Sequence, residues 1–134
     1  MGTGVAVFVN DIYRPDLDFY KMEGSNGTNN IGEWLGLVAA LEVATKLSKS
    51  KEFFDVDFSI SLYGDSQLVV RQYNGIYRIK EDTFRPMMRQ AKELAFGLGN
   101  RLKVIEWIPR GQNKEADRLS KKAIREFLVE NNMI

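Results

Sequence analysis

One long segment of the sequence, residues 31–48, is apolar around most of its helical circumference. Trp34, Leu37 and Leu41 follow the spacing of a single helical face, and the apolar residues between them widen that face almost all the way round. A helix of this kind is normally enclosed by other elements rather than lying on the surface. The segment therefore predicts a helix that is packed from two sides.

The remaining periodicities predict strands and helices that follow one another along the chain. Strands are predicted over residues 5–9, 17–22, 57–63 and 102–108, and helices over 31–48, 67–72, 81–97 and after a capping Asn113. The first two strands would form a hairpin that turns around Pro15 and Asp16. This order predicts a single α/β domain over residues 1–134, with a mixed β-sheet flanked by helices.

The absence of two residue types excludes several kinds of chemistry. The 134 residues include no Cys and no His. This excludes disulfide frameworks, zinc ribbons, thiol nucleophiles, imidazole general bases and His-ligated metals. Acid–base or metal chemistry would have to use carboxylates, Lys, Tyr or the backbone. The net charge of +1 gives no overall basic character, so any basic surface must be local.

The N-terminal residues have neither the basic stretch nor the apolar length of a signal peptide. No apolar stretch approaches the ~20 residues that are needed to cross a bilayer. We therefore expect a soluble cytoplasmic protein that has no membrane partner.

Three acidic residues stand where predicted strands end and predicted helices begin. Glu33 is expected in the first turn of the long helix, Asp65 just after a strand, and Asp117 in the first turn of the last helix. Such ends gather on one side of an α/β sheet, where ligands usually bind. Carboxylates that converge there repel one another unless a cation holds them, and Mg²⁺ and Mn²⁺ prefer oxygen ligands.

The same positions have an ordinary structural explanation. Asp65 could cap the helix that follows it, and the helix macrodipole favours Glu33 and Asp117 near helix N-termini. Periodicity alone does not bring the three carboxylates together in space, so both explanations stay open at this point.

Three segments of the sequence resemble, in order, those of the type 1 ribonucleases H. Residues 28–33 are similar to the family's TNN-x-x-E segment, and residues 65–67 are similar to its D-S-Q segment. Residues 113–119 are similar to its N-x-x-A-D-x-L segment. The spacing is family-like over essentially the whole chain, and the likeness is greatest to compact archaeal and bacterial members. The resemblance implies a ribonuclease H-like α/β fold.

The resemblance also implies an activity, namely endonucleolytic hydrolysis of the RNA strand of RNA–DNA hybrids with two Mg²⁺ or Mn²⁺ ions. Glu33, Asp65 and Asp117 would be the catalytic carboxylates, and they would also be the metal ligands. The residue types agree with this chemistry, because it needs neither His nor Cys.

Four further side chains would bind the substrate. The amides of Asn29, Asn30 and Gln67 would contact the hybrid in its minor groove, where they can pair with 2′-hydroxyls. Arg110 would act in the loop where the family commonly has a His. Helix capping by the asparagines, and plain solvation of Gln67 and Arg110, are the alternatives.

The family's first central strand, which carries its first catalytic Asp, has no counterpart in the sequence. Residues 2–8 match the Gly-rich entry to the second strand, and residues 17–22 match the third. Asp11 lies too close to Glu33 to leave room for the following hairpin, so we do not expect it to be catalytic. Three explanations are open: an N-terminally truncated reading, a sheet that closes up with an altered strand order, or a strand supplied by another chain.

Without that Asp, three carboxylates would stand where the family uses four, so we expect weak or no activity from this chain. The alternative function is a catalytically dead module of the same fold that binds an RNA–DNA hybrid or RNA. We expect a monomer, unless another chain donates the strand.

Overall fold

The computed structural model describes residues 2–22, 29–79 and 82–130. The strands are β1 (Gly2–Val5), β2 (Phe8–Val9), β3 (Ile12–Tyr13), β4 (Phe19–Met22), β5 (Ile60–Gly64) and β6 (Leu102–Trp107). The α-helices are α1 (Asn29–Ser48), α2 (Gln67–Tyr73), α3 (Arg85–Leu98) and α4 (Lys114–Glu130). This architecture confirms the predicted α/β class. Among these helices, none combines the length and the apolar character that a membrane span requires.

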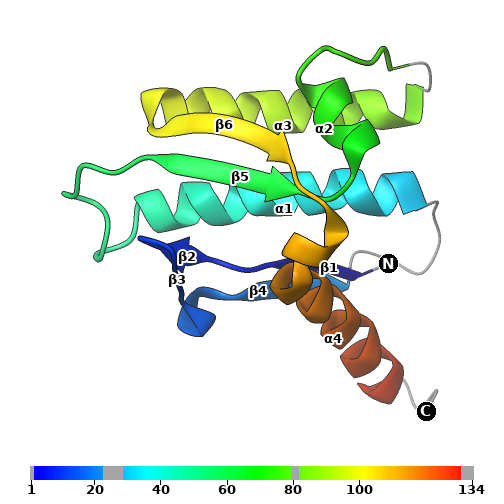
Figure 1. Ribbon diagram of the computed structural model, residues 1–134, viewed down its shortest axis with the longest axis horizontal. Coiled ribbons are helices and arrows are strands. Elements are labelled where there is room, and N and C mark those ends of the chain that lie inside the picture. The colour runs from blue at the N-terminus through cyan, green and yellow to red at the C-terminus, as the bar shows by residue number, and fades with distance from the viewer. Residues whose placement is uncertain (1, 23–28, 80–81, 131–134) are drawn as a thin grey trace.

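Helix α1 is enclosed by other elements, as its apolar circumference predicts. It packs against α3 and also against β1 and β5, and Figure 1 shows it passing behind β5. The side chains of Trp34 and Leu41 are completely buried. Truncating either of them to Ala would cost about 3–5 kcal/mol. The indole Nε1 of Trp34 donates to Oε1 of buried Gln72 at 2.9 Å, which satisfies its one polar atom.

The N-terminal strands form a hairpin whose turn lies at Asn10 and Asp11. Both residues have positive φ, 51° and 66°, which is the backbone of a type I′ turn. β2 and β3 pair in antiparallel fashion on either side of it. The chain does turn at Pro15 and Asp16, in the 3₁₀ turn Pro15–Leu17 between β3 and β4, but the prediction that the hairpin reverses there is wrong. Asn and Asp tolerate the left-handed conformation, and this outweighed the Pro-Asp turn signal.

The described strands form separate ladders. β1 pairs with β4 in antiparallel fashion, and β5 pairs with β6 in parallel fashion. In the part of the chain that is described, β6 is the one ladder partner of β5, and no strand closes onto the other edge of β5. The alternative in which the sheet closes up with an altered order is therefore wrong. The division falls between β1 and β5, where the resemblance predicts the missing strand.

Helix α4 packs on β1 and β4, which it crosses in front in the view of Figure 1. Leu119 and Ala123 supply its buried face. β5 points toward the N-terminal end of α1, and the hairpin tip between β2 and β3 lies at the opposite end of the molecule (Figure 1). The fold thus gathers the end of β5 and the starts of α1, α2 and α4 in one region.

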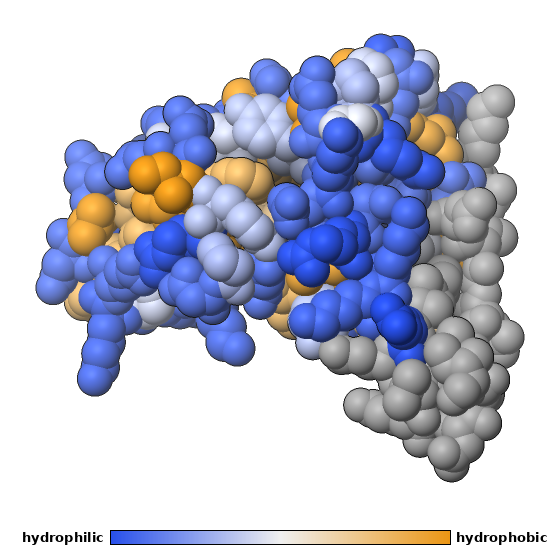
Figure 2. All heavy atoms as spheres, turned by 60° about the horizontal axis from the view of Figure 1, so that its bottom comes forward, coloured by the Kyte–Doolittle hydropathy of each residue, from blue (hydrophilic) through white to orange (hydrophobic). Residues whose placement is uncertain are grey.

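Exposed apolar side chains mark the other end of the molecule. Phe8 and Ile12 project from the hairpin, and Phe54 and Val56 from the segment that follows α1. Figure 2 shows orange patches toward the left, the end that carries these elements in Figure 1, on a face that is otherwise largely hydrophilic.

Candidate active site

Three carboxylates from separate elements approach one another where β5 ends. Glu33 lies on α1, Asp65 directly follows β5, and Asp117 lies in the first turn of α4. We call these three residues the acidic rim. Burial raises the pKa of the Glu33 carboxyl, the charge of Asp65 raises it further, Arg110 opposes the rise and Asp117 adds to it. The charges of Asp65 and Asp117 thus act on Glu33, while the catalytic and metal-binding roles of the three residues stay predictions.

Helix capping or the helix macrodipole explains the position of only one of the three acidic residues. Helix α1 begins at Asn29, two residues before the predicted start, so no acidic residue lies in its first turn and Glu33 stands beyond it. Ser66, rather than Asp65, caps α2, because its side chain accepts a hydrogen bond from the backbone N–H of Val69 at 3.3 Å. The macrodipole explanation holds for Asp117.

Asp65 has the most buried side chain of the acidic rim. Its side chain is 9% exposed. Oδ2 accepts a hydrogen bond from Nδ2 of Asn113 at 3.1 Å, and its backbone carbonyl accepts one from Nε1 of Trp107 at 3.2 Å. These bonds fix the carboxylate at the strand end, with one oxygen turned toward the start of α4.

Arg110 lies between two members of the acidic rim. Its Nε is 3.6 Å from Oδ2 of Asp65, and its Nη2 is 3.9 Å from Oε1 of Glu33. Both distances exceed those of hydrogen bonds, so these contacts are loose ion pairs. The side chain is 71% exposed and belongs to the short 3₁₀ turn Arg110–Gln112. The structure therefore puts Arg110 beside the acidic rim, while its predicted substrate role stays a prediction.

Asp117 has its own cationic neighbour. Its Oδ2 lies 3.0 Å from Nζ of Lys121, one turn further along α4. Two cationic side chains therefore accompany the three carboxylates of the acidic rim.

The acidic rim fits a hard divalent cation by the chemistry of its donors, since Mg²⁺ and Mn²⁺ take carboxylate oxygens. Its side chains do not close around a single point: within the described residues, no three acidic side chains converge closely enough to hold a metal ion. Arg110 stands between two of the carboxylates and Asp117 is turned to Lys121. Binding of a metal ion at the acidic rim would therefore require these side chains to rearrange.

The predicted substrate-binding amides lie close to the rim along the chain. Asn30 is exposed in the first turn of α1, one turn before Glu33. Gln67 is exposed at the start of α2, two residues after Asp65. The side chain of Asn29 lies outside the described residues. The substrate roles of these amides stay predictions.

Two residues of the site were not predicted from the sequence. Asn113 was expected to cap α4 with its side chain, whereas its carbonyl accepts from the backbone N–H of Asp117 and its amide is used on Asp65. The Asn of the N-x-x-A-D segment was the signal for this role. Lys121 follows Asp117 by four residues, a spacing that brings side chains together on a helix.

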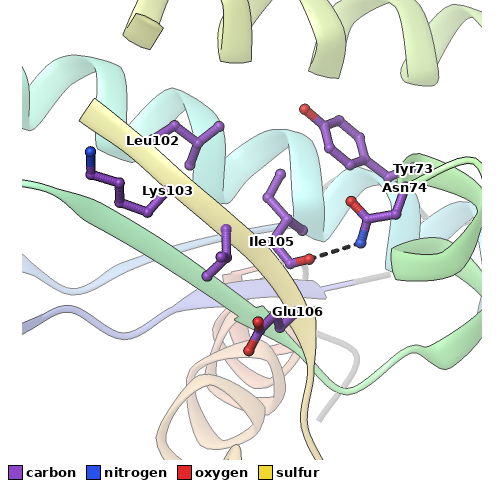
Figure 3. A pocket seen from close by; sticks show the side chains of 7 residues that line it. Tyr73, Asn74, Leu102, Lys103, Ile105 and Glu106 are labelled. Atoms are coloured by element: carbon purple, nitrogen blue, oxygen red, sulfur yellow. Dashed lines mark hydrogen bonds between the residues drawn. The ribbon is translucent and has the colours of Figure 1, made fainter. Parts of the chain in front are cut away.

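A hollow of about 410 Å³ lies away from the acidic rim, along the outer edge of β6. Figure 3 shows Tyr73, Asn74 and residues of β6 around it, with Nδ2 of Asn74 donating to the carbonyl of Ile105 at 2.9 Å. No carboxylate of the rim lines this hollow, so it does not belong to the candidate site.

Several known proteins have sequences similar to this chain. A family model described as "Reverse transcriptase-like" matches residues 17–123. A bifunctional protein of Mycobacterium tuberculosis is 32% identical over 123 residues, which are 92% of this chain and 31% of that protein. Ribonuclease HI of Halobacterium salinarum is 36% identical over 97 residues, which are 72% of this chain and 44% of that protein. The chain thus spans less than half the length of these curated relatives.

Solved structures agree with the sequence relatives. RNase H1 of Halobacterium salinarum superposes with a TM-score of 0.77 at 28% identity, covering 93% of this chain and 86% of that chain. LC11-RNase H1, solved in complex with an RNA/DNA hybrid, gives a TM-score of 0.78 at 29% identity, covering 95% and 87%. On this evidence the chain belongs to the reverse transcriptase-like family, and its sequence and fold are similar to those of type 1 ribonucleases H.

Proposed function

We propose that this chain acts on RNA–DNA hybrids as an endoribonuclease that cleaves the RNA strand. The observation that carries the proposal is the approach of Glu33, Asp65 and Asp117 at the end of β5, two of them without a helix-end explanation. Support comes from the relatives, one of which was solved with an RNA/DNA hybrid bound.

The acidic rim would hold two Mg²⁺ or Mn²⁺ ions. When bound, such ions supply an activated water and stabilise the leaving 3′-oxygen. Asp65 is held in place for this by Asn113. Asn30 and Gln67, together with Asn29, would contact 2′-hydroxyls of the hybrid in its minor groove.

The activity is expected to be weak or absent in this chain as it stands. Three carboxylates attract divalent ions less strongly than four, and the ladders of β1 and β5 are not joined in the described residues. A module that binds the hybrid without cleaving it is therefore the second candidate function. The presence of three carboxylates instead of four favours it.

A cleavage assay separates the two candidates. Purified chain is incubated with an RNA–DNA hybrid, and separately with duplex DNA and single-stranded RNA, in Mg²⁺ or Mn²⁺. If the chain is an enzyme, it should slowly cleave the RNA strand of the hybrid in the presence of metal and should leave the other two substrates intact. Hybrid binding that weakens with salt but gives no cleavage would indicate the binding module. Robust cleavage would overturn the expected weakness, and absence of both binding and cleavage would overturn the proposal.

A further inference from the structure

The acidic rim already has cations beside it. Arg110 stands between Glu33 and Asp65, and Lys121 stands beside Asp117. We propose that Arg110 is a resident counter-ion of the rim, which competes with divalent cations and must leave Glu33 and Asp65 before a metal ion binds there. This inference rests on the proposed function and specifies how its metal site is controlled.

The competition follows from the atoms that Arg110 faces. Its Nε lies 3.6 Å from Oδ2 of Asp65, the oxygen that also accepts from Asn113 at 3.1 Å. A divalent ion such as Mg²⁺ takes its oxygen ligands at about 2.0–2.1 Å. An ion on this oxygen would lie next to the guanidinium, and two like charges so close repel each other. The same conflict arises at Oε1 of Glu33, which is 3.9 Å from Nη2 of Arg110.

A second arginine shows how loosely Arg110 is held. Arg14 pairs with Asp16 at 2.7 Å and with Glu52 at 2.6 Å, and its side chain is 28% exposed. The ion pairs of Arg110 are about 1 Å longer, and its side chain is 71% exposed. Arg14 thus makes charge-assisted hydrogen bonds, whereas Arg110 interacts with Glu33 and Asp65 only through longer ion pairs. Its exposed position lets it move away without disturbing the core.

The counter-ion also has a role while the metal is absent. Glu33 and Asp65 are both partly buried acids on elements that the core holds together. Both carboxylates lie within 4 Å of the same guanidinium, and a positive charge between two negative ones reduces their mutual repulsion. Arg110 therefore keeps the metal-free site assembled, at the expense of metal affinity.

Calorimetric titration with Mn²⁺ alone tests the competition on the full chain. Arg110→Gln is expected to bind Mn²⁺ about two- to fivefold more tightly than the wild type, the range that loss of an exposed ion pair allows. Lys114→Gln is the matched control: it removes one positive charge beside Asn113, and Lys114 makes no ion pair with the rim in the described structure. It should change the affinity by much less than Arg110→Gln.

The Asp65→Asn variant separates failure of this inference from failure of the proposed function. If Asp65→Asn binds Mn²⁺ as well as the wild type, the metal site itself is wrong. If Asp65→Asn weakens binding while Arg110→Gln leaves it unchanged or weaker, the site stands and the counter-ion role is overturned. If the wild type does not bind Mn²⁺ but Arg110→Gln does, the inference is supported. If neither protein binds Mn²⁺, the inference is contradicted.

The side chain can also be observed directly. In an ¹⁵N spectrum, the Nε–Hε signal of Arg110, assigned by its loss in Arg110→Lys, should shift as Mg²⁺ is added. The shift should reach half its final size at the Mg²⁺ concentration that half-saturates the protein, and it should be absent in Asp65→Asn. A signal that stays in place at saturating Mg²⁺ would contradict the inference, because the guanidinium would then not have moved.

Discussion

Asp65 and Asp18 are buried to nearly the same degree but lie in different kinds of surroundings. Their side chains are 9% and 12% exposed, and each has an arginine from the C-terminal part of the chain nearby. Asp18 accepts a short hydrogen bond from the hydroxyl of Tyr13 and lies 3.7 Å from Arg118. Asp65 accepts a hydrogen bond from an amide and has Arg110 at 3.6 Å.

The two arginines explain the contrast. Arg118 has partners of its own, since it donates to the hydroxyl of Tyr13 at 3.2 Å and to Oε2 of Glu115 at 3.1 Å. The cluster around Asp18 therefore ties the N-terminal hairpin to α4. Arg110 pairs only loosely, and with carboxylates of the rim. Asp18 thus links two elements, whereas the ion pair of Asp65 is with an exposed arginine of the acidic rim.

The same substitution at both positions should separate these roles. Asp65→Asn is expected to reduce any metal-dependent cleavage by about 100-fold or more, because the metal contributes several kcal/mol to the transition state. Its melting temperature should barely change, since an Asn oxygen can still accept from the Asn113 amide. Hybrid cleavage on a gel, together with a thermal melt, measures both. Retained cleavage would mean that Asp65 is not a metal ligand.

Asp18→Asn is expected to give the opposite pattern. It removes the charge that receives the Tyr13 hydroxyl and faces Arg118, so the free energy of unfolding should fall by about 1–3 kcal/mol. Urea denaturation measures this loss. Hybrid cleavage by the folded variant should match the wild type. A stability equal to that of the wild type would show that the cluster around Asp18 does not stabilise the packing of the N-terminal hairpin on α4.

Asn113→Ala tests the amide that distinguishes the setting of Asp65. Loss of the bond to Oδ2 should lower cleavage and Mn²⁺ affinity by about tenfold, as expected for a residue that orients a ligand. Asn74→Ala is the control, because its amide also makes one hydrogen bond but to the Ile105 carbonyl, away from the rim. Equal effects of the two variants would indicate a general loss of stability.

The smallest expected effect concerns Glu33. Because burial and the neighbouring carboxylates raise its pKa in the folded state, the folded protein holds this proton more tightly than the unfolded one. The protonated carboxyl therefore contributes to the stability of the folded state below the ordinary pKa of about 4.3, and this contribution is lost as pH rises through the raised pKa. Glu33→Gln should therefore be more stable than the wild type at pH 7, by a few tenths of a kcal/mol after allowance for solvent screening.

The stability difference should vanish below the ordinary pKa, which urea denaturation across the pH range can follow. Glu42→Gln, an exposed position on the same helix, controls for the loss of one charge. A difference that grew toward low pH would contradict the sign of the shift.

Local patterns were enough to predict the central elements. The apolar circumference of residues 31–48 predicted an enclosed helix, and the alternation in residues 57–63 predicted the strand before Asp65. Burial on a face repeats along the chain, so it is visible in the sequence. The hairpin turn was predicted in the wrong place because two turn signals lie close together, and only the pairing of β2 with β3 decides between them.

The candidate site was predictable in its residue types but not in its contacts. The three segments that resemble the family supplied Glu33, Asp65 and Asp117, and the structure brings them into electrostatic range. The amide of Asn113 could not be placed in advance, because its direction depends on where the end of β5 lies relative to α4. The loose contacts of Arg110 likewise depend on the course of the turn before α4.

The buried bond between Trp34 and Gln72 has a consequence for engineering. Trp34 adjoins Glu33 on α1, and Gln72 lies on α2, the helix that follows Asp65. This buried hydrogen bond therefore links the helix that carries Glu33 to the helix that follows Asp65, and neither of its partners is a titratable group. Substitution of the charged side chains of the acidic rim leaves this hydrogen bond intact, so the proposed cation site can be altered without removing the link between α1 and α2.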